Sequence, residues 1–144
     1  MGMNARLRRS AAGLAALLIA ATAWGQPDRG AEAPVFRAID VRNQLVGLAD
    51  ELAKEPDPLV LFFFTPDHGR ELAERLREVH GTLAKVIAVG LKADAEALRA
   101  FAEDLRISYY VIENSPELNA DALYGPFQML PVTIFITSDK TILK

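Results

Sequence analysis

The sequence predicts an α/β domain built around a mixed sheet, and three features of the chain lead to this prediction. The first is the unbroken apolar run Leu59–Phe64, whose Phe and Val content is typical of a strand buried on both faces. The second is the stretch after the turn Thr65–Gly69, where Leu72, Leu76 and Val79 recur at helical spacing. The third is another buried strand at Lys85–Leu91, because strands that alternate with helices indicate an α/β sheet.

The remaining elements follow from shorter patterns and from residues that begin or end helices. We expect strands at Val35–Ile39, Tyr109–Ile112 and Leu130–Ile136, helices at Leu48–Ala53, Gly69–His80, Ala93–Leu105 and Ser115–Tyr124, and the start of a last strand at Thr141–Lys144. Asp94 is the expected N-cap of the third helix, and Ser115 followed by Pro116 marks the start of the fourth.

Composition limits the classes of function. The chain has 144 residues, enough for one domain, and its formal net charge of −3 offers no basic surface for nucleic acid. It contains no cysteine. Disulfides, thiolate metal sites and thiol catalysis by these residues are therefore excluded.

The first 25 residues have the three parts of a secretory signal peptide. Arg6, Arg8 and Arg9 form a basic region, Ala11–Ala23 is small and apolar, and Ala23-Trp24-Gly25 predicts cleavage before Gln26. Cleavage would remove three of the 16 basic residues and leave a net charge of −6. The apolar run is shorter than the roughly 20 residues of a membrane-spanning helix, although an uncleaved anchor stays an alternative.

The chain is therefore expected to have a signal peptide at 1–25, a flexible leader at 26–33 and one domain at 34–144. Such a protein is periplasmic or secreted and has no membrane span after cleavage. The pair Arg8-Arg9 leaves both the general and the twin-arginine export routes open.

Residues 33–144 resemble a thioredoxin-fold domain of the TlpA/redoxin (AhpC/TSA-type) family. The matching segments, in order, are Ala33-Pro34-Val35-Phe36, Leu59–Phe64, Arg70-Glu71-Leu72, Val86–Leu91, Phe101-Ala102-Glu103, Tyr124-Gly125 and Leu130–Ile136. The resemblance implies a three-layer domain in which helices flank a mixed central sheet, with a cis bond before Pro131 facing the active-site turn. It also implies a longer last strand and a terminal helix beyond Lys144, so both are expected to be incomplete in this sequence.

The chain departs from the family at the catalytic element, which is Cys-x-x-Cys at the start of a helix. Reading back from Arg70-Glu71 places that motif on Pro66-Asp67-His68-Gly69, whereas reading forward from Thr65 puts His68 at the first cysteine. The register stays open, and both thiols are missing in either one. Thiol–disulfide exchange needs a thiolate, so the family's redox and peroxidase activities do not carry over. We expect no cofactor.

Asp67 and His68 occupy the former active-site turn and allow two interpretations. They are either a carboxylate–imidazole pair that acts as acid and base or as a weak metal site, or an ordinary helix cap beside a solvated histidine. The second interpretation is favoured, because Asp is a common N-cap. Metal binding needs three or four ligands, and His80 lies about three turns along the same helix, so no metal site is expected. His80 is expected to interact with free carbonyls at the helix end.

The candidate binding residues are Thr65, Leu130 and Pro131. In the family, the backbone before this proline pairs with extended peptide substrates, so Leu130 is expected to pair with an extended polypeptide or an exported protein partner by strand addition. The alternative is that Pro131 only preserves an inherited bend. Tyr109-Tyr110 and Phe127 are candidates for the rim of a groove near Pro131.

Three functions stay open from the sequence. The first is an exported, redox-inactive binding or accessory module. The second is a repurposed hydrolytic or acid/base site that uses Asp67 and His68. The third is a gene fragment without function.

Overall fold

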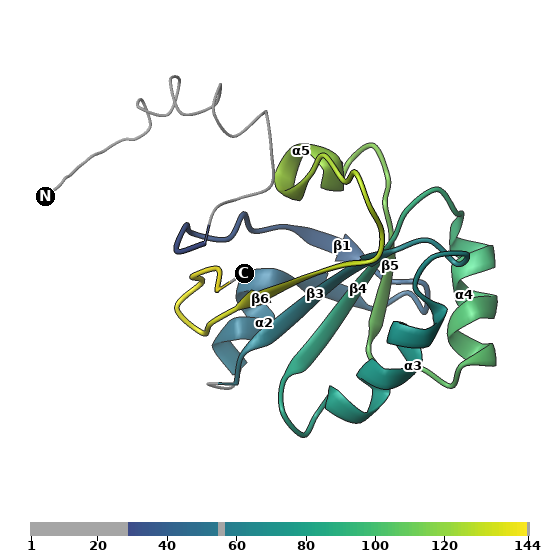
Figure 1. The fold of residues 1–144 in the computed structure, drawn as a ribbon, viewed down its shortest axis with the longest axis horizontal. Helices are drawn as coiled ribbons and strands as arrows, with labels where there is room; N and C mark the ends of the chain where they lie inside the picture. Colours follow the sequence, from purple (N-terminus) through teal and green to yellow (C-terminus); the bar gives the residue numbers. More distant parts are fainter. Residues whose placement is uncertain (1–28, 55–56, 144) are drawn as a thin grey trace, which may run out of the picture.

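A four-stranded mixed sheet with the order β5-β4-β3-β6 forms the centre of the structure (Figure 1). The structure, a computed structural model, describes residues 29–54 and 57–143. The strands are β3 (Leu59–Phe64), β4 (Lys85–Gly90), β5 (Tyr110–Glu113) and β6 (Val132–Ile136). β3, β4 and β5 are parallel, whereas β6 runs antiparallel to β3. The predicted α/β class with a mixed sheet is confirmed. The signal peptide, its cleavage site and residues 26–28 of the leader lie outside the described residues.

Strand β3 is central because it pairs along both edges and is covered on both faces. Leu59 pairs with Lys85 of β4 and with Ile136 of β6, and every residue of Leu59–Phe64 is buried. A strand in this position has no face on which a polar side chain is solvated. This explains the continuous apolar run.

Two helices cover one face of the sheet: α3 (Arg70–Val79) and α4 (Ala95–Asp104). Their buried side chains pack on every second residue of the strands, for example Phe62 and Phe64 of β3. Helix α4 begins as predicted, since the carboxylate of Asp94 accepts a hydrogen bond from the backbone N–H of Ala97 at 2.8 Å.

The opposite face is covered by the antiparallel hairpin of β1 (Arg37–Ile39) and β2 (Leu45–Gly47) and by two short helices. These helices are α2 (Leu48–Lys54) and α5 (Ala120–Tyr124). The covering layer packs on the β3 residues Leu59, Leu61 and Phe63. The domain therefore has three layers, as the resemblance implied.

Two predicted elements differ from the structure. Helix α5 begins at Ala120 rather than at Ser115, because the Ser115 hydroxyl accepts the backbone N–H of Leu118 at 3.1 Å and closes a separate turn. Asn119 then adopts a left-handed conformation (φ +50°), which separates this turn from the helix that begins at Ala120. The predicted last strand is also absent from the described residues, where Thr141 and Ile142 form isolated bridges with Glu32 and Ile136.

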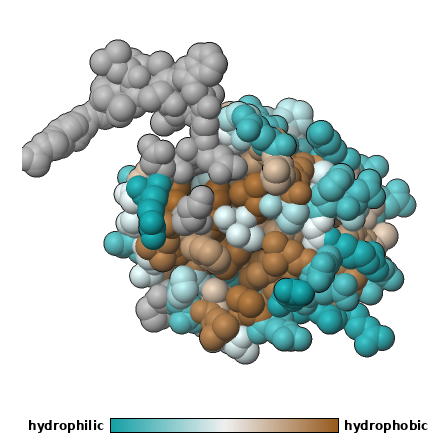
Figure 2. Space-filling model, in the orientation of Figure 1, coloured by the Kyte–Doolittle hydropathy of each residue, from teal (hydrophilic) through white to brown (hydrophobic). Residues whose placement is uncertain are grey.

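Part of the α3–α4 face remains apolar and exposed over β6. Phe135 is 43% exposed and Leu143 is 45% exposed, and the Leu143 N–H donates to the Phe135 carbonyl at 2.7 Å. Figure 2 shows hydrophobic side chains gathered on this side of the molecule. The described helices of this face, α3 and α4, pack on β3, β4 and β5 and leave β6 uncovered.

Candidate functional site

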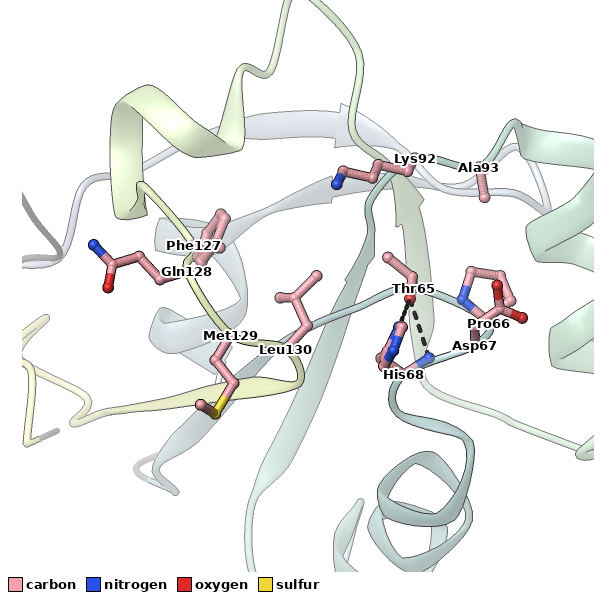
Figure 3. A pocket seen from close by; sticks show the side chains of 10 residues that line it. All are labelled: Thr65, Pro66, Asp67, His68, Lys92, Ala93, Phe127, Gln128, Met129 and Leu130. Atoms are coloured by element: carbon pink, nitrogen blue, oxygen red, sulfur yellow. Dashed lines mark hydrogen bonds between the residues drawn. The ribbon is translucent and has the colours of Figure 1, made fainter.

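A cavity of about 540 Å³ lies at the carboxyl ends of β3 and β4 (Figure 3). Its wall comes from three segments that are distant in sequence: Thr65–His68 after β3, Lys92-Ala93 after β4, and Phe127–Leu130 before β6. The carboxyl edge of parallel strands is where α/β domains commonly bind ligands, because the loops of several strands converge there. The cavity is therefore the candidate site.

The turn after β3 is closed by Thr65 and His68. The Thr65 hydroxyl accepts the backbone N–H of His68 at 3.0 Å, and its oxygen lies 3.2 Å from the imidazole Nδ1, within hydrogen-bond distance. Thr65 is buried, whereas Asp67 and His68 are exposed. His68 is thus joined to Thr65, and within the described part of the chain it makes no hydrogen bond with Asp67.

Helix α3 is capped by backbone geometry instead of by the predicted Asp67 side chain. Gly69 is the N-cap, with φ +146° and no side-chain cap. A Cβ at this position would lie 2.8 Å from Phe64 Cβ and 3.5 Å from Pro131 Cβ. The helix start therefore lies too close to the end of β3 for a side chain larger than that of glycine, and Pro131 is in ordinary van der Waals contact with it. The Leu130–Pro131 peptide bond is cis.

The segment Phe127–Leu130 offers an unpaired backbone to the cavity. Pairing between β6 and β3 begins at Val132 with Phe63, and the backbone groups of Phe127–Leu130 make no hydrogen bond with other described residues. The segment is nevertheless anchored, since the Phe127 ring lies 4.6 Å from the Phe63 ring and Leu130 packs on the core. Met129 is 79% exposed.

Lys92 is a cavity residue that sequence reasoning missed. It follows β4 with a left-handed backbone (φ +58°), and its side chain reaches over the cavity in Figure 3. Its ammonium group forms no ion pair with any residue in the described ranges. The signal available was its position just after a buried strand, at the edge where ligands bind.

Tyr109 and Tyr110 do not rim this site, contrary to expectation. Both line a second cavity of about 430 Å³ at the opposite, amino end of β4 and β5. Tyr109 is buried, and its hydroxyl donates to the Ala73 carbonyl at 2.8 Å. Phe127 is the one member of the predicted rim that lines the cavity beside Leu130.

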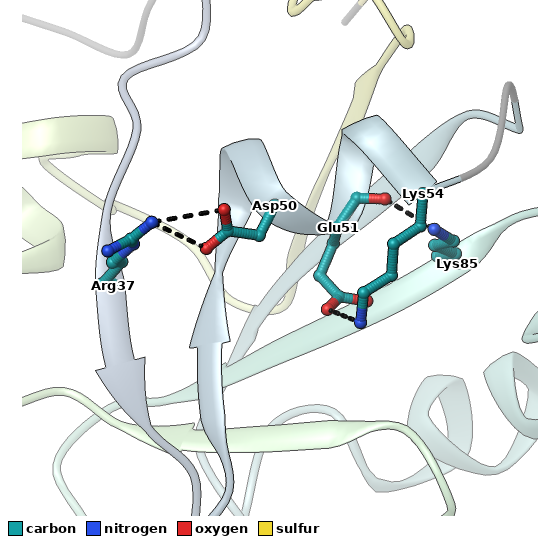
Figure 4. A network of polar contacts seen from close by, with 5 residues as sticks. All are labelled: Arg37, Asp50, Glu51, Lys54 and Lys85. Atoms are coloured by element: carbon teal, nitrogen blue, oxygen red, sulfur yellow. Dashed lines mark hydrogen bonds and ion pairs between the residues drawn. The ribbon is translucent and has the colours of Figure 1, made fainter.

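A polar network borders the second cavity (Figure 4). The Lys54 ammonium lies 2.7 Å from the Glu51 carboxylate, and the Lys85 ammonium donates to the Glu51 carbonyl at 2.5 Å. The hydrogen bond to Glu51 and the negative charge of that carboxylate raise the pKa of Lys54. On the outer side of the hairpin, Arg37 pairs with Asp50 at 3.1 Å.

His80 also differs from the prediction. Its Nδ1 accepts the backbone N–H of Val86 at 3.0 Å, so the ring serves as an acceptor and does not donate to helix carbonyls. Burial lowers the pKa of His80, and the positive charge of Lys85 lowers it further, while the Glu51 carboxylate opposes them.

Metal-binding and membrane-spanning features were sought among residues 29–54 and 57–143. This part of the chain brings together no group of three His, Asp or Glu side chains that could hold a metal ion. None of its helices combines the length and the apolar character needed to cross a membrane.

The fold is similar to that of several solved thiol:disulfide oxidoreductases. The chain is similar to a thioredoxin-family thiol:disulfide interchange protein from Chlorobium tepidum, with 15% identity and a TM-score of 0.62 over 81% of this chain and 84% of that one. It is also similar to a secreted disulfide oxidoreductase from Mycobacterium tuberculosis, with 19% identity and a TM-score of 0.60 over 74% and 79% of the two chains.

A DsbF homologue from Corynebacterium diphtheriae gives a similar result, with 22% identity and a TM-score of 0.64 over 82% of this chain and 79% of that one. No protein-family model and no curated protein matches the sequence. At these identities the likeness shows the fold alone. The chain has a thioredoxin-like fold and lacks the cysteines with which such folds perform redox chemistry.

Proposed function

We propose that this chain is an exported thioredoxin-like binding module that holds an extended polypeptide in the cavity beside Pro131, without thiol chemistry. One observation carries the proposal: the backbone of Phe127–Leu130 borders a cavity and has no hydrogen-bond partner in the described chain. Unpaired backbone groups are a template for strand addition, in which main-chain hydrogen bonds hold a peptide of extended conformation.

The surroundings of this segment suit a peptide. Phe127 and Leu130 are fixed by packing on the core, so little conformational entropy is lost when a ligand pairs with the segment between them. The exposed Met129 side chain can adapt to apolar side chains of different shape. The absence of cysteine from all 144 residues excludes disulfide exchange by this chain, which is consistent with a role in binding.

The acid/base alternative has less support. A hydroxyl–imidazole pair that works as nucleophile and base also needs a third group to orient the imidazole, and within the described residues the only hydrogen bond of the His68 ring is that to Thr65. Thr65 also accepts the backbone N–H of His68, so the pair closes a local turn. This geometry favours a structural role for the two residues.

The binding test uses the full chain and an array of random octapeptides, with the strongest binder resynthesised as a fluorescent probe. Strand addition predicts that N-methylation at alternate residues of the probe weakens binding at least tenfold in one register and little in the other. This follows because successive N–H groups of an extended chain point to opposite sides. Equal effects in both registers would contradict the proposal.

Two proline variants test the protein side of the same pairing. Gln128→Pro and Met129→Pro each remove one backbone N–H of this segment, and the variant that removes an N–H paired with the peptide should abolish probe binding. Gln128→Ala and Met129→Ala are the matched controls, since they change only the exposed side chains. Thermal melts confirm that each variant is folded. Unchanged binding by both folded proline variants would refute the proposal.

Export is tested separately by expressing the full chain and fractionating the cells. The proposal predicts a product outside the cytoplasm whose mass corresponds to cleavage before Gln26. A cytoplasmic product that retains Met1–Gly25 would show that the chain is not exported.

A further inference from the structure

We propose that Lys92 makes this cavity selective for peptides that carry a carboxylate. The inference rests on the proposed peptide-binding function, and it assigns the chemical class of the ligand. The structural basis is the position of one ammonium group without an ion pair above a cavity whose wall includes the apolar side chains of Phe127, Met129 and Leu130.

The position of Lys92 is set by the sheet and does not depend on a flexible loop. The preceding residue, Leu91, is buried and donates its backbone N–H to the Phe64 carbonyl at 2.7 Å, which ties this loop to the end of β3. Lys92 then turns the chain with φ +58°. Figure 3 shows its side chain extending across the cavity toward Phe127.

The charge of Lys92 is not neutralised within the site. Lys54 and Arg75 pair with carboxylates of their own helices, whereas Lys92 forms no ion pair within the described residues. Asp67 lines the same cavity, yet it forms no ion pair with Lys92, and Figure 3 places it on the far side of Thr65. A bound peptide would therefore meet an available positive charge.

The apolar wall strengthens this preference. Phe127, Met129 and Leu130 exclude water once a peptide is seated against them, and charges attract more strongly where water is excluded. The net charge of the chain is −3, and −6 after the proposed cleavage, so long-range attraction does not favour acidic partners. Selection for a carboxylate must then come from this local ammonium group.

The experiment compares peptides of identical sequence that differ only in charge. Each position of the octapeptide probe is replaced in turn, by Glu in one peptide and by Gln in its pair. Every peptide is made with a free C-terminus and with an amidated C-terminus. We expect one carboxylate position to improve binding about two- to fivefold, as for a partly exposed ion pair. A preference lost on amidation assigns the carboxylate to the C-terminus, and one lost with Gln assigns it to a side chain.

The protein variants are Lys92→Gln, Lys92→Glu and the control Lys140→Gln. Lys140 also has a left-handed backbone (φ +69°), so its replacement perturbs the backbone equally, but it lies beyond the opposite end of β6. Lys92→Gln should erase the carboxylate preference, Lys92→Glu should reverse it so that the uncharged peptide of each pair binds better, and Lys140→Gln should leave it unchanged.

The outcomes separate this inference from the proposed function. Peptide binding that depends on the backbone register, but is equal for Glu and Gln peptides and for free and amidated C-termini, would overturn the inference and leave the proposed function standing. A Glu preference that survives in folded Lys92→Gln would also overturn it. Absence of any peptide binding would refute both.

Discussion

The imidazole of His80 substitutes for a strand at the edge of the sheet by accepting the backbone N–H of Val86 at 3.0 Å. The N–H of Lys85 points toward β3, where it donates to the Pro58 carbonyl, so the next N–H points to the opposite edge. β5 begins one residue further on, at the Ile87–Tyr110 pair, and has no partner for Val86. His80 supplies the missing acceptor from the end of α3.

The His80 contact predicts a pH-dependent stability. Burial lowers the pKa of His80 in the folded state below its ordinary value of 6.5. Below pH 6.5 the unfolded chain therefore binds more protons than the folded chain, and the free energy of unfolding falls as the pH decreases. Stability from this group is complete above pH 6.5 and is lost on acidification. Urea denaturation from pH 8 to pH 5 measures it.

The matched variants for this prediction are the two histidines of the chain. His80→Ala should cost about 1–3 kcal/mol at pH 8, because the Val86 N–H loses its acceptor, and should flatten the pH dependence between 7 and 5. His68→Ala keeps His80 and should retain the fall. A pH dependence that is unchanged in His80→Ala would contradict this assignment.

The two glycines that flank α3 should respond differently to the same substitution. Gly69→Ala places a Cβ 2.8 Å from Phe64 Cβ at φ +146°, so both backbone strain and overpacking oppose it, and we expect a loss of about 2–4 kcal/mol. Gly81→Ala also has a positive φ (+84°) but meets no atom within 4 Å, so about 1–2 kcal/mol is expected. Chemical denaturation measures both, and equal losses would argue against the tight contact.

Substitutions of Phe63 and Phe135 distinguish the covered part of the sheet from the exposed part. Phe63→Ala removes a side chain that is 1% exposed and should cost about 3–5 kcal/mol, and it should also weaken probe binding because Phe127 packs on that ring. Phe135→Ala, at 43% exposure, should cost less than about 1 kcal/mol. A loss above 2 kcal/mol for Phe135→Ala in thermal or urea unfolding would show that this face is covered in solution.

The Tyr124 hydroxyl ties α5 to the N-terminal segment by donating to the Pro34 carbonyl at 2.6 Å. Tyr124→Phe should cost about 1 kcal/mol, because that carbonyl loses its donor. Tyr110→Phe is the control, since within residues 29–54 and 57–143 the only tyrosine hydroxyls that form hydrogen bonds are those of Tyr109 and Tyr124. Burial also raises the pKa of Tyr124, so it should resist ionisation in an alkaline absorbance titration until the protein unfolds. Early ionisation of Tyr124 would contradict its burial.

Most residues of the candidate site could be predicted from the sequence, but the contacts between them could not. The resemblance pointed to Thr65, Leu130 and Pro131, and the structure brings these segments together around one cavity. Lys92 was missed because an exposed lysine after a strand has no periodic or compositional signal. His68 was paired with Asp67 by adjacency, whereas its side chain bonds back to Thr65, three residues earlier.

The sequence by itself determined the central strands and the main helices and that thiol chemistry is absent. The continuous apolar run Leu59–Phe64 and the capping Asp94 act through local patterns, and these are readable in one dimension. Only the tertiary structure decided the cap at Gly69, the role of His80 and the convergence of Lys92 with Leu130. The physical reason is that these depend on which atoms the folded chain brings within a few ångströms across long sequence separations, and no local pattern encodes those distances.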